Sequence, residues 1–412
     1  MLSFTRRLPM EGAGALPGVR PPAAGHAATV TAAAALAVLL LAPTPAQAQL
    51  SETHTLEAEA VSVRNLVGEV RVVPGSGSRI QVTVVRAGPD AGELSVEVRR
   101  EGDQEVLRVM YPDDRIVYRP LGRLSRSEWS PGDRNPFTEL VPARSRRITI
   151  AGSGRGLEAH AEITVRLPAG KRLGLYHAAG EVHLADVEGE LDVNVRSASV
   201  QAVGITGPLR VNGRSGSVRV DRALGDVRVR TRSGAIQAHA VQGEVVELAA
   251  RSGTVEAGDL TFARADLSAR SGRVRLEGAQ GGRLSVKTRS GRIQGGDLEV
   301  GEVLITSRSG GAQLRRLAAG TLQAEARSGS IDLDLIRQVA TGRVSTRSGQ
   351  VTVRVPRTFS AELDLQTRGR IRVDVPAGAV DQSRNRFRGR LGDGGARLEV
   401  RNRSGGIRIV EG

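Results

Sequence analysis

Apolar and polar residues alternate along most of the chain beyond residue 50, in runs too short for helices. The position three residues before a recurrent Arg is apolar in nine consecutive units: Val193, Val211, Val229, Leu248, Leu267, Val286, Ile305, Ala324 and Val344. A period of two is typical of β-strands that bury one face, and no helical periodicity is present after residue 50. The pattern predicts an all-β protein.

The alternation keeps phase with a recurring triplet, Arg-Ser-Gly. Gly tolerates a positive φ angle and Ser can hydrogen-bond to a turned backbone, so the triplet is expected to form a corner. A second corner is expected at segments such as "VQGE" (241–244). The triplet starts at Arg214, Arg232, Arg251, Arg270, Arg289, Arg308, Arg327, Arg347 and Arg403, with related units at Arg196 ("RSA") and Arg368 ("TRGR").

Two architectures fit a repeat of 18 to 20 residues. An antiparallel meander would need more than about twenty consecutive strands, whereas open sheets rarely exceed about ten. Stacked coils explain why like positions recur, because each coil buries its face against its neighbours. We therefore predict a parallel β-solenoid of about 18–20 residues per coil with irregular caps. The array is expected over 148–375, an N-terminal β-region or cap over 49–110, and a loop with a C-terminal β-cap over 376–412.

Residues 111–147 interrupt this pattern with Pro, Ser, Arg and four of the chain's nine aromatic residues. Such breakers favour a long inserted loop. Arg beside aromatic rings suits an anionic or ring-bearing ligand, so Tyr118, Trp129, Arg123 and Arg126 are candidate ligand contacts. The alternative is a disordered or cap-covering insertion.

The N-terminus resembles a secretory signal peptide over 1–48. Arg6, Arg7 and Arg20 precede an apolar run at 27–42, and an Ala-x-Ala exit signal ends at Ala48. The run is short for a membrane span of about 20 residues, although a retained anchor is the competing interpretation. We expect an exported protein that is periplasmic, on the cell surface or secreted, without a transmembrane span in the mature chain.

The formal charge of +15 comes almost entirely from Arg, since Lys171 and Lys287 are the only lysines. A basic surface attracts polyanions, although an Arg-rich genome and simple solubility would give the same balance. The chain contains no Cys, which excludes disulfides and thiolate chemistry. Aromatics make up only 2% of the residues, which suits a thin aliphatic core.

The aligned units resemble a bacterial family of candidate adhesins, domain of unknown function 4097. The resemblance rests on "VRNLVGEVRV" (63–72), "VRLPAG" (165–170) and "TRSGAI" (231–236), and it covers most of the mature chain. It implies a β-repeat fold in the cell envelope and supplies no catalytic residue. The Arg before nearly every Ser-Gly and the 111–147 insertion depart from the usual family pattern.

In a solenoid the recurrent arginines would form a line of cations. An unpaired line of guanidinium groups would suit an anionic glycan, lipopolysaccharide or extracellular DNA, with no specific nucleic-acid recognition expected because aromatics are not interleaved. The alternative is that each Arg tethers its own turn by donating to carbonyl groups. The predicted polyanion-binding residues are Arg214, Arg232, Arg251, Arg270, Arg289, Arg308, Arg327 and Arg347.

Catalysis has little support in the sequence. Asp332 and Asp334 share one strand face and could serve as an acid/base pair or hold a cation, but such pairs are common on solvated faces. The mature chain's histidines show no zinc spacing, and no cofactor is expected. Three classes remain: a non-catalytic envelope binding protein, a structural or self-assembling rod or scaffold, and a polysaccharide-active β-helix enzyme.

Overall fold

The computed structural model describes residues 50–130 and 136–412, and the predicted signal segment 1–48 lies outside that part. The described chain is almost entirely β-structure, with three short 3-10 helices: η1 (Ala91–Glu93), η2 (Arg119–Leu121) and η3 (Thr138–Leu140). No helix within 50–130 or 136–412 has the length and apolar character needed to span a membrane.

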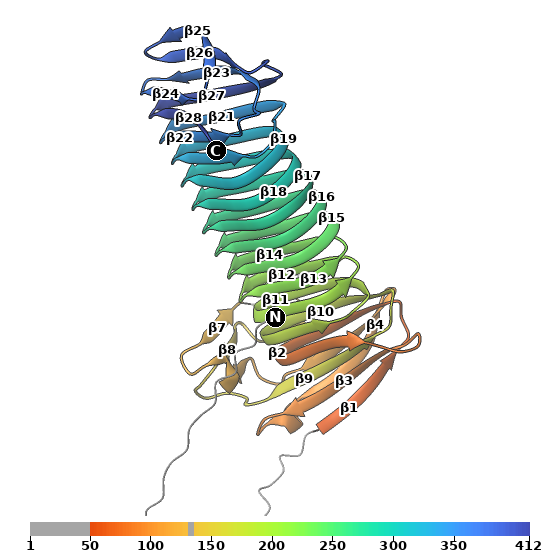
Figure 1. Ribbon diagram of the computed structural model, residues 1–412. Helices are drawn as coiled ribbons and strands as arrows, with labels where there is room; N and C mark the ends of the chain where they lie inside the picture. The colour runs from red at the N-terminus through yellow and green to blue at the C-terminus, as the bar shows by residue number, and fades with distance from the viewer. Residues whose placement is uncertain (1–49, 131–135) are drawn as a thin grey trace, which may run out of the picture. The chain divides into compact units, whose positions relative to one another are not determined.

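Parallel coils stack in register through the middle of the chain (Figure 1). Five strands each run round a whole coil: β15 (Ile236–Ser252), β16 (Val255–Ser271), β17 (Val274–Ser290), β18 (Ile293–Ser309) and β19 (Ala312–Ser328). Val255 pairs with Val274 and Ser271 with Ser290, a step of 19 residues. The prediction of a parallel β-solenoid is confirmed.

The same stacking continues on both sides of these coils. Below β15 lie β10 (Lys171–Ala185), β11 (Gly189–Thr206), β12 (Leu209–Ser215), β13 (Val218–Leu224) and β14 (Val227–Ser233). Above β19 lie β20 (Ile331–Leu335), β21 (Thr341–Ser348) and β22 (Val351–Val355). The step is 18 residues at first, 19 in the middle and 20 at the end, because the corners differ in length.

The N-terminal β-region is a coil of the solenoid, not only a cap. Strand β2 (Ala60–Pro74) pairs in parallel with β10, and its other edge is covered by β5 (Gln104–Met110) and β9 (His160–Leu167). Antiparallel strands then finish this end: β1 (Leu50–Leu56), β3 (Ile80–Ala87) and β4 (Ser95–Glu101). The array therefore begins before the predicted boundary at residue 148.

The C-terminal segment also lies inside the array, which corrects its expected place as the cap. Strands β27 (Ala396–Ser404) and β28 (Ile407–Glu411) pair in parallel with β21 and β22 on one side. On the other side they pair with β23 (Ala361–Thr367) and β24 (Ile371–Asp374). The antiparallel strands β25 (Ala377–Ser383) and β26 (Arg386–Leu391) cover β23. The last segment of sequence is thus the second-last coil in space.

The insertion is folded rather than a long loop. Its strands β6 (Arg115–Val117) and β7 (Arg126–Trp129) form a small sheet with β8 (Ile148–Ala151), which directly follows the insertion. Glu139 of η3 accepts hydrogen bonds from Arg64 of β2 and Arg108 of β5, at 2.7 and 2.9 Å. Arg64 and Arg108 are each 7% exposed, so these buried bonds tie the insertion to the first coils.

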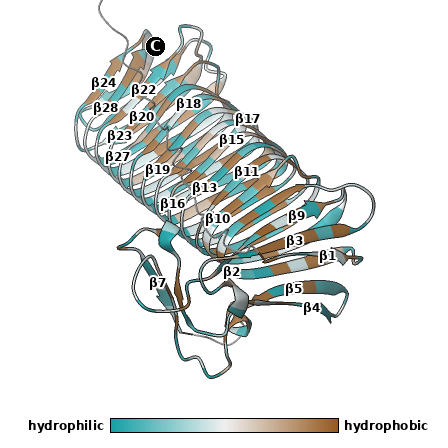
Figure 2. Cartoon of the chain, turned by 90° about the horizontal axis from the view of Figure 1, so that it is seen from below, coloured by the Kyte–Doolittle hydropathy of each residue, from teal (hydrophilic) through white to brown (hydrophobic). Residues whose placement is uncertain are grey.

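A thin aliphatic core runs the length of the stack. Inward-facing Val255, Val274 and Ile293 occupy equivalent positions in three successive coils and are at most 1% exposed. Figure 2 shows the corresponding alternation of hydrophobic and hydrophilic segments along the coils. The buried faces are filled by Val, Leu, Ile and Ala, which explains how the array forms with so few aromatic residues.

One buried histidine makes stability depend on pH. His177 of β10 is 0% exposed, and its Nε2 lies 2.9 Å from the carbonyl oxygen of Gly68 in the neighbouring coil. Burial lowers the pKa of His177 from 6.5 to about 4. The folded state therefore holds the neutral ring, with Nε2–H donating to Gly68.

We expect acid to destabilise the array through His177. Because the folded pKa lies below the unfolded value, this contribution is complete above pH 6.5 and is lost as the pH falls toward 4. The loss should approach about 3 kcal/mol, since each pKa unit corresponds to about 1.4 kcal/mol. Urea unfolding at pH 7.5 and 4.5 measures it.

His177→Gln should flatten that pH dependence, whatever its effect on absolute stability. The matched control is His239→Gln, whose exposed ring lies on the outer surface. His239→Gln should keep the full pH dependence, whereas His177→Gln should keep only a smaller one from His160, whose pKa is also lowered by burial. An unchanged pH dependence in His177→Gln would contradict the assignment.

Candidate functional site

The recurrent arginines form one continuous column on the outside of the coils. All but Arg368, which precedes Gly369, stand one residue before a Ser that pairs with the equivalent Ser of a neighbouring coil, as Ser252 does with Ser271. The "arginine column" is, in spatial order, Arg196, Arg214, Arg232, Arg251, Arg270, Arg289, Arg308, Arg327, Arg347, Arg403 and Arg368. Ten steps of about 4.8 Å give a length of about 48 Å.

The structure brings together all eight predicted polyanion-binding arginines and adds three. Arg403 and Arg368 are spaced more widely in the sequence than the other units, so the period alone does not place them in the column. They join the column in reversed order because β27 and β28 are inserted beneath β23 and β24. No local signal in the sequence indicates that insertion.

Beyond Arg196, the side chains of the column have no ionic partner among the described residues. From Arg214 to Arg368 every member is exposed, and within the described residues none donates from its guanidinium to a carboxylate or a carbonyl group. The alternative in which each Arg tethers its own turn is therefore not what the structure shows. Two unit charges 4.8 Å apart in water repel by roughly 0.9 kcal/mol, so the column holds uncompensated repulsion that a bound anion would relieve.

A shallow groove follows the upper part of the column. Its volume is about 560 Å³, and its cationic lining is Arg289, Arg308, Arg327 and Arg347. Small hydroxyl side chains such as Thr306 and Ser345 form part of the floor, and Glu325 is the one acidic lining residue. An extended anionic chain could lie here with its acidic groups against the guanidiniums and its hydroxyls against Ser and Thr.

The lower end of the column is closed by the insertion. The guanidinium carbon of Arg196 lies 4.2 Å from the centre of the Trp129 ring, and Ser127 Oγ is 2.8 Å from Ser197 Oγ. Partial burial and neighbouring Arg214 lower the pKa of Arg196 to about 10, which leaves it cationic at neutral pH. The open part of the column therefore begins at Arg214.

The candidate contacts in the insertion divide into two groups. Tyr118 and Trp129 are only 9% and 6% exposed and pack edge-to-face against His160 and Phe137. Their rings are in the core, so the expectation that they contact a ligand is corrected. Arg123 and Arg126 are exposed, Arg126 within 3.1 Å of Glu128, and their role as ligand contacts stays a prediction.

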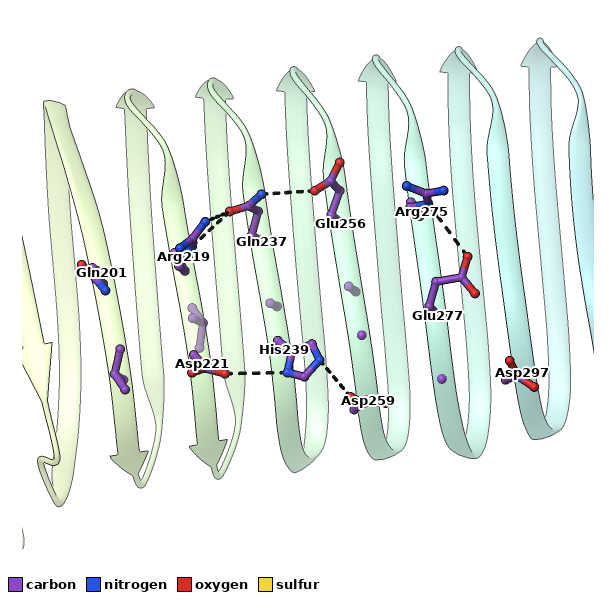
Figure 3. A pocket seen from close by; sticks show the side chains of 16 residues that line it. Gln201, Arg219, Asp221, Gln237, His239, Glu256, Asp259, Arg275, Glu277 and Asp297 are labelled. Carbon is purple, nitrogen blue, oxygen red and sulfur yellow. Dashed lines mark hydrogen bonds and ion pairs between the residues drawn. The ribbon is translucent and has the colours of Figure 1, made fainter. Parts of the chain in front are cut away.

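A second groove, of about 840 Å³, crosses an adjacent face of the coils (Figure 3). Gln237 accepts from Arg219 at 2.8 Å and donates to Glu256 at 3.2 Å, forming one row. In the other row His239 lies between Asp221 and Asp259, at 3.7 and 2.9 Å. Charged side chains of this groove therefore already have polar partners, in contrast to those of the arginine column.

A left-handed corner that sequence analysis missed borders the second groove. Its non-glycine members have φ angles between 50° and 54°. The slot is held in successive coils by Asp186, Gly204, Arg222, Ala240, Asp259, Gly278, Asp297 and Arg316. No shared residue type marks these positions, so no sequence signal could have identified them.

Both carboxylates of the candidate acid pair have partners in neighbouring coils. Asp332 pairs with Arg354 of the next coil, and Asp334 accepts from the backbone N–H of Arg316 at 3.4 Å. Across the described part of the chain, no group of three or more His, Asp or Glu side chains could hold a metal ion. The two carboxylates are accounted for by contacts between coils.

Comparison with known proteins gives one family. The family model described as Toastrack DUF4097 matches residues 160–296 and 242–410. Among solved structures, a candidate cell adhesion protein from Clostridium sporogenes has 9% identity over 88% of this chain and 100% of its own. Its TM-score of 0.17 is too low to indicate a shared arrangement. No curated protein matches the chain.

Proposed function

The chain belongs to the Toastrack DUF4097 family, and we propose that it is an exported, adhesin-like, non-catalytic protein that binds linear anionic glycans along the arginine column. The observation that carries this proposal is that the guanidiniums of the arginine column from Arg214 to Arg368 are aligned, exposed and unpaired among the described residues. Self-repulsion within the column favours a ligand whose charges recur at a similar spacing.

An anionic glycan fits this surface better than a nucleic acid does. Every column Arg from Arg214 to Arg403 is followed by a Ser, and among the described residues no aromatic side chain stands between these arginines to stack on a base. Guanidiniums bind carboxylate, sulfate and phosphate groups through two parallel donors, and the hydroxyls can bond to sugar oxygens. Lipopolysaccharide and extracellular DNA offer the same charges and serve as competing ligands in the test.

Export is supported by the sequence of residues 1–48, with its basic head, apolar run and Ala-x-Ala exit. A location outside the cytoplasm would bring the column into contact with envelope or extracellular glycans. Fractionation of cells that express a C-terminally tagged chain tests this part, and retention of full-length protein in the cytoplasm would contradict it.

The binding test replaces three adjacent column residues. Arg308→Gln/Arg327→Gln/Arg347→Gln should weaken binding to long heparin or dextran sulfate by about tenfold, since each exposed ion pair contributes about 0.2–1 kcal/mol. Wild-type binding should fall steeply between 50 and 300 mM salt and should strengthen with polymer length. Fluorescence anisotropy or biolayer interferometry measures both trends.

A charge-matched control is available at other positions of the solenoid surface. Arg264, Arg283 and Arg316 are exposed but paired with Asp266, Glu302 and Asp297. Replacing these three by Gln removes the same charge and should change affinity less than twofold. Equal weakening by both triple variants, or none by the column variant, would overturn the proposal.

A structural rod is the second candidate, favoured by one observation. Strand β24 pairs only with β28, so its outer edge is unpaired among the described strands. Such an edge is a template for another strand. Concentration-dependent filaments in negative stain would support this role, and monodisperse particles at high concentration would exclude it.

A further inference from the structure

One stretch of the arginine column carries a second file of cations. The position three residues after the column Arg, just beyond the Ser-Gly corner, is neutral in most coils and Arg in two adjacent ones. From Arg214 to Arg347 its occupants are Ser217, Ala235, Thr254, Arg273, Arg292, Gly311, Ser330 and Gln350. Arg273 and Arg292 therefore stand beside Arg270 and Arg289.

The backbone positions that carry these side chains lie within a small area. Three residues span at most about 10 Å, and neighbouring coils are about 4.8 Å apart. Lys287 adds a fifth cation two residues before Arg289, on the outward face of β17. We call Arg270, Arg273, Lys287, Arg289 and Arg292 the "dense cluster".

No acidic group within the described residues neutralises the dense cluster. All five side chains are exposed and form no ion pair there. Two acids on the same two coils already have partners, Asp266 with Arg264 at 2.7 Å and Glu277 with Arg275 at 3.9 Å. Lys171, the other lysine, shows the contrast, because it is buried and bonded to Glu59 at 2.6 Å.

We infer that the dense cluster is a preferred site for a glycan segment bearing two anionic groups per sugar, such as a multiply sulfated or phosphorylated oligosaccharide. Single-file coils offer one guanidinium per step of about 4.8 Å, whereas the dense cluster offers at least two. A ligand with one charge per sugar would leave the second file unmatched, so selectivity follows from charge density. This inference rests on the proposed function and adds a preferred binding site within the arginine column.

Short ligands isolate the dense cluster from the rest of the column. A heparin tetrasaccharide should bind the wild-type protein more tightly than tetragalacturonate, which has one carboxylate per sugar. Arg273→Gln/Arg292→Gln should weaken heparin tetrasaccharide binding by about fivefold to tenfold and change tetragalacturonate binding less than twofold. Isothermal titration calorimetry at low salt measures both affinities.

The control is Arg214→Gln/Arg232→Gln, which removes two equally exposed column charges where the third position is Ser217 or Ala235. It should leave the selectivity for the heparin tetrasaccharide unchanged. Equal selectivity in the two double variants would overturn the dense cluster as a site. If replacing Arg308, Arg327 and Arg347 left the binding of long polymers unchanged while Arg273→Gln/Arg292→Gln still weakened tetrasaccharide binding, the extended column would be contradicted as a binding surface and the dense cluster would be supported.

Discussion

Gly272→Ala is expected to open the corner between β16 and β17 roughly thirtyfold to a thousandfold more often than in the wild-type protein, corresponding to about 2–4 kcal/mol. Hydrogen exchange of the amides on either side of residue 272 measures this local stability. The effect is expected to be large because two independent costs fall on the same atom.

The first cost is a collision between coils. A Cβ at Gly272 would lie 1.8 Å from the carbonyl oxygen of Gly253 in the coil below, and one at Gly291 would meet Gly272 in the same way. The second cost is conformational, since Gly272 has a φ of 156°, at the limit of what a side chain tolerates. Backbone atoms cannot move aside without separating the ladder.

Gly92→Ala is the matched control. An added Cβ at Gly92 has no atom within 4 Å, and this residue does not require a positive φ. It should be neutral or slightly stabilising, because Ala restricts the unfolded chain. If Gly272→Ala showed the same exchange rates around residue 272 as the wild-type protein, the close stacking of coils would not be the reason for a glycine at this position.

The repeat made the fold predictable because the same physical requirement recurs at every coil. Val255 and its equivalents must point inward, and Gly272 and its equivalents must admit the carbonyl of the coil beneath. Ala198 takes the place of the corner glycine in the "RSA" unit. It has no positive φ, and β11 continues through this position without a break, so no glycine is required there. Period and corner could therefore be deduced from residue types alone.

The termini could not be deduced in the same way. The sequence places Arg403 after Arg368, whereas the stack places it before. Likewise β2 is an inner coil because β5 and β9, which follow it in sequence, cover its outer edge. Neighbouring coils need only compatible apolar faces, so their order depends on long-range pairing rather than on local pattern.

The candidate site was predictable in its residues and not in its surroundings. Eight column arginines follow from the period, but the absence of partners for Arg289 or Arg308 depends on which acids lie nearby in three dimensions. The insertion misled for a related reason. Trp129 beside several arginines suggests an exposed contact, whereas its ring packs on Phe137 and supports Arg196.

Removing residues 396–412 is expected to unfold the end of the solenoid formed by β23 to β26, here called the C-terminal cap. Strands β27 and β28 supply the only described ladder between β21–β22 and β23–β24. Leu398, Val400, Ile407 and Ile409 are each at most 1% exposed, and burying four such side chains contributes about 6–12 kcal/mol before chain entropy is counted. Exchange protection across 361–391 should be lost, while β15–β19 keep theirs because repeat arrays unfold locally.

A point variant separates loss of this coil from loss of chain length. Val400→Asp places a carboxylate in the aliphatic core between β21 and β23 and should destabilise the same region, whereas Arg403→Gln on the same strand alters an exposed side chain and should not.

The truncated chain has one other possible outcome: β23 could pair directly with β21, since Thr341 and Glu362 both face Arg397 in the present register. Retained protection across 361–391 in the truncated chain would show this re-pairing and would mean that the inserted coil is dispensable for the cap. Lost protection would mean that the final residues of the sequence hold the end of the solenoid together.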